Sequence, residues 1–127
     1  MSRERKKILV IDDDADIRET VSLILDEDYD IVTADNGKMG LTKIHSEKPD
    51  LIILDVMMTH MSEGLDIAKK LKEDKELKKI PVIMLTSVNE HFDYRSQIDD
   101  SYFPKDCWID KPVKSEKLLN TIKKYLK

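Results

Sequence analysis

The stretch that decides the fold is Leu51-Ile52-Ile53-Leu54-Asp55, four apolar residues followed directly by a carboxylate. Pro49 and Asp50 precede it, and a methionine-rich stretch without helical periodicity follows it. A short, continuous apolar run between turn signals is typical of a strand buried on both faces, as in parallel sheets. Because ligands bind at the carboxyl ends of the strands in open α/β sheets, Asp55 is the first candidate site residue.

Further strands and helices are predicted on both sides of this run. Four segments are predicted to be strands, at residues 8–11, 29–34, 80–85 and 107–110. Apolar residues at helical spacing predict helices at residues 15–26, 39–45, 65–71 and 118–126, with a short helix around 89–99. The 29–34 segment alternates only weakly, which favours an edge position in the sheet. Either Asp14 or Asp16 can cap the first helix.

Alternating strands and helices predict an α/β fold, a doubly wound sheet of five parallel strands. Right-handed crossovers restrict the topology, and the order 2-1-3-4-5 places the first and third strands side by side. A chain of 127 residues is the length of one domain. We therefore expect a single domain over residues 1–127.

Composition narrows the setting in which this domain works. The net charge of −4 gives no general attraction to nucleic acid or to an anionic membrane. Cys107 is the single cysteine, which excludes an internal disulfide and fits a reducing compartment. The basic N-terminus leads into only four apolar residues, which is too few for a signal peptide. These features predict a cytoplasmic protein with no direct nucleic-acid or membrane partner.

Acidic residues follow two of the predicted strands. Neighbouring strands lie about 4.8 Å apart, so Asp12, Asp13 and Asp55 are expected to converge on one cleft. Such carboxylates raise one another's pKa, and a divalent cation or a fixed ammonium group would stabilise them. Mg²⁺ suits such donors, and Lys111 after the last strand can supply the ammonium. Thr86 adds a hydroxyl after the fourth strand, and this set matches attack of a carboxylate on a phosphoryl group.

In this order, these pieces resemble a receiver domain of a bacterial two-component response regulator, the CheY-like family. The matching pieces are Asp12-Asp13, Pro49 to Asp55, Pro81 to Thr86 and Lys111-Pro112, and the resemblance covers essentially the whole chain. It implies the flavodoxin-like (βα)5 fold and a signalling domain in a phosphorelay rather than an enzyme. No output domain follows in this chain, and whether it stands alone or is a piece of a longer regulator stays open.

The resemblance also implies individual roles. Asp55 would accept phosphate from a sensor histidine kinase. Asp13 would bind Mg²⁺ or Mn²⁺ directly and Asp12 through water. Asp55 and the backbone carbonyl of Met57 would complete the protein's share of the metal site.

Three more positions correspond to functional places in the family. Thr86 and Lys111 would contact the phosphoryl group. Trp108 stands three residues before the lysine, at the family's aromatic switch position, and a packed residue without a switching role is equally expected. The phosphorylated form would signal to a downstream protein partner, and a homodimer is left open.

The chain also departs from the family's pattern. Thr59 and Glu63 stand where a proline and a glycine are usual, and a single inserted residue accounts for this. Residues 89–106 are longer than usual and rich in aromatic residues, so we expect a non-standard partner surface there. Met57 and Val88 cannot orient an attacking water, which predicts slow self-dephosphorylation.

Three other functions share parts of this pattern. An aspartate-nucleophile phosphohydrolase needs an acid two residues after the nucleophile, where this chain has Met57. A flavodoxin-like cofactor binder needs a hydroxyl- and glycine-rich loop after the first strand, and acids stand there instead. A degenerate receiver-like interaction module, not regulated by phosphorylation, is the alternative that remains.

Overall fold

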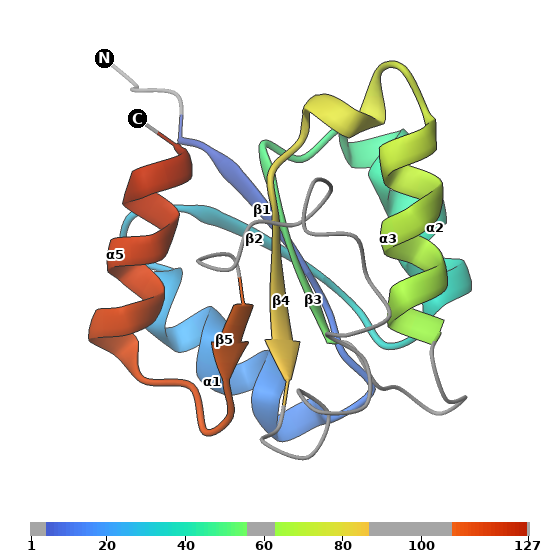
Figure 1. Cartoon of the computed structure of the whole chain (residues 1–127). Helices are drawn as coiled ribbons and strands as arrows, with labels where there is room; N and C mark the ends of the chain where they lie inside the picture. The colour runs from blue at the N-terminus through green and yellow to red at the C-terminus, as the bar shows by residue number, and fades with distance from the viewer. Residues whose placement is uncertain (1–4, 56–62, 87–107, 127) are drawn as a thin grey trace.

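A computed structural model describes residues 5–55, 63–86 and 108–126 (Figure 1). Its strands are β1 (Lys7–Ile11), β2 (Asp30–Ala34), β3 (Leu51–Asp55), β4 (Val82–Thr86) and β5 (Trp108–Asp110). All neighbouring pairs are parallel, and the strand order is β2-β1-β3-β4-β5. The predicted fold class and strand order are therefore confirmed, including the edge position of β2.

Helices cover both faces of this sheet. They are α1 (Ala15–Leu25), α2 (Gly37–Glu47), α3 (Glu63–Glu73) and α5 (Ser115–Tyr125), with a 3-10 turn η1 (Leu77–Lys79) before β4. Figure 1 shows α1 and α5 on one face and α2 and α3 on the other. The helix predicted around 89–99 lies outside the described residues. Among the described residues, no helix combines the length and apolar character needed to cross a bilayer.

The sheet interior explains why the first four residues of β3, Leu51 to Leu54, are all apolar. All five residues of β3 are buried. Ile52 and Leu54 pack in the core under α2 and α3, whereas Leu51 and Ile53 pack in the core under α1 and α5. Because successive side chains of a strand point to opposite faces, a strand segment covered on both sides is apolar at successive positions, here Leu51 to Leu54.

Local hydrogen bonds set where the helices begin and end. The Asp14 carboxylate caps α1 by accepting from the main-chain N–H of Asp16 at 2.9 Å, so Asp14 is the cap of the two predicted candidates. Asn36 caps α2 by accepting from the main-chain N–H of Met39 at 2.8 Å. The left-handed backbone of Lys48, with φ of 48°, ends α2 before Pro49.

The fourth strand starts later than predicted. Ile80 does not begin it, because its N–H closes the η1 turn on the carbonyl of Leu77 at 3.0 Å. Pro81 has no N–H to donate, and its carbonyl accepts from Ile52 at 3.0 Å. The strand prediction at 80–85 is therefore wrong at its start, and β4 runs Val82–Thr86.

Close packing of α2 on β1 requires a glycine. A Cβ atom at Gly40 would lie 2.6 Å from Cδ1 of Ile11 and 3.1 Å from its Cγ1. Ile11 is fully buried, so it has little room to move away. Gly40 thus lets α2 lie directly against the strand that leads into the acidic loop.

Candidate functional site

The ends of β1 and β3 bring three carboxylates together. Ile11 pairs with Leu54, so the next residues along the two strands, Asp12 and Asp55, are side by side at the carboxyl edge of the sheet. Carboxylate oxygens of Asp12, Asp13 and Asp55 all lie within 4.8 Å of one another. Asp12 and Asp55 are buried, whereas Asp13 is exposed. This cluster has the donor type and spacing that a hard divalent cation binds.

Lys111 balances part of this negative charge. Its Nζ atom lies 3.0 Å from Oδ1 of Asp55 and 3.7 Å from Oδ2 of Asp12. The lysine side chain is itself largely buried, with 22% of its surface exposed. Because the two carboxylates are almost fully buried, water screens these ion pairs much less than it would at the surface.

The two oxygens of Asp12 have different surroundings. Oδ1 accepts a hydrogen bond from the main-chain N–H of Asp14 at 2.9 Å. Oδ2 is buried and accepts no hydrogen bond from any residue that the structure describes. Burial raises the pKa of Asp12, and the hydrogen bond from Asp14 and the charge of Lys111 offset this only in part. A buried carboxylate oxygen without a donor is destabilising, and a bound cation would satisfy it.

The other predicted site residues lie at the edges of the described structure. Thr86 ends β4, where its backbone pairs with Asp110, but its side chain and the whole of Met57 lie outside the described residues. Trp108 pairs in register with Met84 and is buried with it in the core under α2 and α3, with 6% of its surface exposed. The site roles of these residues remain predictions.

One residue of this region was missed by the sequence analysis. Nη1 of Arg18 donates a hydrogen bond to the main-chain oxygen of Asp12 at 2.7 Å. Side chains of a helix lean towards its N-terminus, so an arginine in the first turns of α1 can reach back over the acidic loop. An arginine shortly after a strand-end acidic pair was therefore a usable signal.

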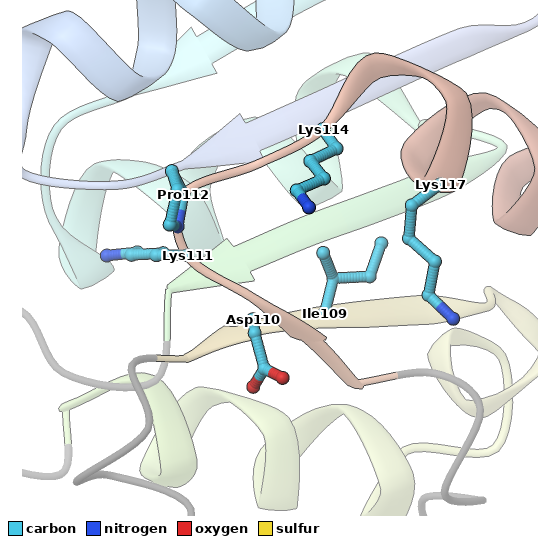
Figure 2. Close-up of a pocket in the computed structure, with 6 residues that line it drawn as sticks. All are labelled: Ile109, Asp110, Lys111, Pro112, Lys114 and Lys117. Carbon is cyan, nitrogen blue, oxygen red and sulfur yellow. The ribbon is translucent and has the colours of Figure 1, made fainter.

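A separate pocket of about 360 Å³ lies beside Lys111, between β5 and α5. Its lining residues are Ile109, Asp110, Lys111, Pro112, Lys114 and Lys117. Figure 2 shows the amine of Lys111 pointing away from those of Lys114 and Lys117. None of the three clustered carboxylates lines this pocket, so the candidate site is the carboxylate cluster itself.

Comparison with known proteins gives one family. The sequence matches the family described as response regulator receiver domain over residues 8–123. It is 42% identical over 89 residues to the alkaline phosphatase synthesis transcriptional regulatory protein PhoP of Bacillus subtilis, which covers 69% of this chain and 36% of that protein. It is 35% identical over 123 residues to the phosphate regulon transcriptional regulatory protein PhoB of Pseudomonas aeruginosa, which covers 96% of this chain and 52% of that protein.

The chain thus spans about half the length, or less, of these curated relatives. Another relative, MtrA of Mycobacterium tuberculosis, is described as a DNA-binding response regulator and is 30% identical over 128 residues, which are 100% of this chain and 53% of that protein. The expectation of no nucleic-acid partner gains no support from such relatives.

Solved structures agree with the fold. The chemotaxis response regulator CheY4 of Vibrio cholerae matches with a TM-score of 0.81 and 31% identity, covering 97% of this chain and 100% of that one. A response regulator receiver domain protein from Clostridium thermocellum matches with a TM-score of 0.80 and 26% identity, covering 95% of this chain and 94% of that one.

Proposed function

This chain belongs to the response regulator receiver domain family of two-component systems, and from that premise we propose that Asp55 accepts a phosphoryl group from a sensor histidine kinase. The observation that supports this role most directly is the position of Asp55 within the cluster. It is the buried carboxylate that lies nearest to the lysine amine, at 3.0 Å, and it stands next to two further acids. A carboxylate kept ionised by a neighbouring cation is ready to act as a nucleophile.

The proposed reaction transfers a phosphoryl group from a histidine nitrogen of the kinase to a carboxylate oxygen of Asp55. A carboxylate oxygen of Asp55 forms a bond to the phosphorus of a phosphohistidine on the kinase. The phosphorus–nitrogen bond breaks, and its electron pair returns to the imidazole nitrogen, which takes up a proton. The product is an acyl phosphate on Asp55 and a free histidine on the kinase. Positioning and charge neutralisation supply most of the rate enhancement in reactions of this kind.

A divalent cation fits the donors that are present. Asp12, Asp13 and Asp55 would hold Mg²⁺ or Mn²⁺, and the unsatisfied Oδ2 of Asp12 is the feature of the structure that favours a cation there. The backbone carbonyl of Met57 is proposed as a further ligand from the family pattern alone. When bound, the cation would neutralise charge that develops on the phosphoryl oxygens.

Residues from β4 and β5 complete the proposal. Lys111 would exchange its contact with Asp55 for one with a phosphoryl oxygen, because transfer places negative charge beside its amine. Thr86 is proposed to donate its hydroxyl to the same group. Trp108 is proposed to act as the aromatic switch that changes position with this rearrangement. Its burial fits a fixed packing role equally well.

We propose a signalling role in the cytoplasm, not an enzyme that acts on other substrates, because the transfer chemistry ends on the protein's own carboxylate. The phosphorylated form would change its affinity for a downstream protein or for a second copy of the chain. Since relatives are DNA-binding regulators, control of a DNA-binding activity in the whole protein is a second candidate output.

The chemical nature of the product tests this proposal. Incubation with radiolabelled acetyl phosphate and Mg²⁺ should label the protein, and neutral hydroxylamine should remove the label, because hydroxylamine cleaves acyl phosphates. Phosphoesters of serine or threonine survive this treatment. A label that resists hydroxylamine, or no label at all, would count against Asp55 as acceptor and in favour of the unphosphorylated interaction module.

A further inference from the structure

The acidic loop after β1 carries Asp12 and Asp13. An arginine side chain that has no role in the proposed phosphoryl transfer contacts this loop. Nη1 of Arg18 donates to the main-chain oxygen of Asp12 at 2.7 Å. The main-chain N–H of the same arginine donates to the carbonyl of Asp14 at 3.1 Å, within the first turn of α1. Arg18 therefore contacts the main-chain oxygens of Asp12 and Asp14, the residues on either side of Asp13.

The contact at Asp12 matters because of the peptide group that it fixes. The carbonyl of Asp12 belongs to the peptide bond that links Asp12 to Asp13. A planar peptide with its oxygen fixed also fixes the direction in which the next residue leaves the loop. Asp13 is exposed, so close packing does not set the direction of its carboxylate. The backbone on either side therefore contributes to its orientation.

The other contacts of this loop act on different atoms. The N–H of Asp12 donates to the carbonyl of Ala34 at 3.1 Å, and the N–H of Asp14 donates to Oδ1 of Asp12 at 2.9 Å. In both contacts a main-chain N–H group of the loop is the donor. Arg18 supplies the contact to the carbonyl, and its charge makes this hydrogen bond stronger than a neutral one.

We propose that Arg18 is a positioning residue for the metal-binding acids, holding the Asp12–Asp13 peptide so that the carboxylate of Asp13 faces Asp55. The inference rests on the proposed function, since it assumes that these acids bind a cation. Groups that orient metal ligands without touching the metal change metal affinity by about 10- to 100-fold when removed. The arginine acts on cation binding and not on the phosphoryl group itself.

The chain provides a matched control for this arginine. Nη2 of Arg5 also donates to main-chain carbonyls, those of Tyr29 at 2.7 Å and of Asp26. Arg5 precedes β1, whereas the acidic loop follows it, so these contacts lie at the opposite edge of the sheet. Arg5→Met removes these two arginine–carbonyl contacts, an ion pair with Asp30 at 3.5 Å and one positive charge without touching the acidic loop.

The direct test is the dissociation constant for Mg²⁺, measured by isothermal titration calorimetry on the whole chain. Arg18→Met should bind Mg²⁺ about 10-fold more weakly than the wild type, and Arg5→Met should match the wild type. The rate of phosphorylation by acetyl phosphate should then fall in Arg18→Met at limiting Mg²⁺ and recover at saturating Mg²⁺. General loss of structure would not produce this separation of affinity from maximal rate.

Equal Mg²⁺ affinity in Arg18→Met and Arg5→Met would overturn the inference. Circular dichroism checks that each variant is folded, and Arg18→Gln, which removes the charge but keeps a shorter polar side chain, replaces Arg18→Met if that variant fails to fold. Arg18→Gln with wild-type affinity would overturn the inference in the same way. Asp13→Asn tests the proposed function separately from the inference about Arg18. If Asp13→Asn binds Mg²⁺ as tightly as the wild type, the proposed function itself is contradicted.

Discussion

The Nζ atom of Lys111 lies 3.0 Å from Oδ1 of Asp55, although the two residues lie at the ends of strands that are not neighbours. Asp55 ends β3, Lys111 follows β5, and β4 lies between them. Because β4 lies between them, β3 and β5 are about 10 Å apart. The long side chain of Lys111 covers most of this distance. The pair therefore closes the candidate site over the end of β4 and joins the centre of the sheet to its edge.

Removal of this lysine should weaken the fold as well as the proposed chemistry. In Lys111→Met the buried carboxylates of Asp55 and Asp12 lose their cation, which should lower the free energy of unfolding at pH 7 by about 1–3 kcal/mol. Mg²⁺ should restore part of this loss. Urea unfolding with and without Mg²⁺ measures both effects, and exposed Lys114→Met is the matched control. Equal stability of the two variants without Mg²⁺ would show that the ion pair contributes nothing.

Asp12 should destabilise the metal-free protein at neutral pH. Burial raises its pKa in the folded state above the ordinary value of 3.8, so the folded protein holds this proton more tightly than the unfolded chain does. The resulting penalty is present above the raised pKa and disappears as the pH falls below 3.8. Asp12→Asn should therefore raise the free energy of unfolding at pH 7 above that of the wild type, because the buried charge is removed.

Two comparisons check this prediction. The increase in the free energy of unfolding caused by Asp12→Asn should shrink as the pH is lowered towards 3.8. Asp13→Asn should cause a smaller increase, because its carboxylate is exposed. Thermal unfolding across a pH series, in the presence of a chelator, measures both. A variant less stable than the wild type at pH 7 would mean that the contacts of Asp12 outweigh its burial.

Most of this fold was predictable because each strand carries its own signal. The first four residues of β3, Leu51 to Leu54, are all apolar, and such a run marks a strand covered on both faces whatever its neighbours are. Parallel topology then carries all strand ends to one edge. This is why the acids at the ends of β1 and β3 and the lysine after β5 could be placed together before their distances were known.

Other features depend on contacts that side-chain patterns do not encode. The hydrogen bond from Arg18 ends on a main-chain oxygen, and every residue has one, so no residue type marks the acceptor. The start of β4 was misplaced because an apolar residue such as Ile80 looks the same in a strand and in a packed turn. The helix expected around 89–99, Met57 and the Thr86 side chain lie outside the described residues, so these predictions stand as made.

The contact between α2 and β1 should not tolerate a side chain at Gly40. In Gly40→Ala the new methyl group would meet the buried Ile11 at 2.6 Å. Overpacking of this kind typically lowers the free energy of unfolding by about 1–3 kcal/mol, which exceeds the roughly 1 kcal/mol that alanine gains in a helix. Thermal unfolding measures the net effect. The double variant with Ile11→Val should recover part of the loss, and a Gly40→Ala protein as stable as the wild type would rule out this close packing.

The phosphorylated form should be long-lived. Met57 and Val88, two residues after Asp55 and Thr86, have apolar side chains that cannot orient a water molecule for attack on the phosphoryl group. After removal of acetyl phosphate, the label should therefore persist for minutes or longer at neutral pH, and Met57→Glu should shorten its lifetime. A wild-type lifetime of seconds would show that another group activates the water.

The central claim is that Asp55 is the phosphoryl acceptor, and intact-mass spectrometry after incubation with acetyl phosphate and Mg²⁺ tests it most directly. The wild type should gain one adduct of about 80 Da. The matched control Asp50→Asn changes the acid at the opposite end of the same strand, where Oδ2 accepts from the N–H of Lys7 at 2.8 Å, and should gain the same adduct. Asp55→Asn should gain none, and an equal adduct on Asp55→Asn would contradict the account.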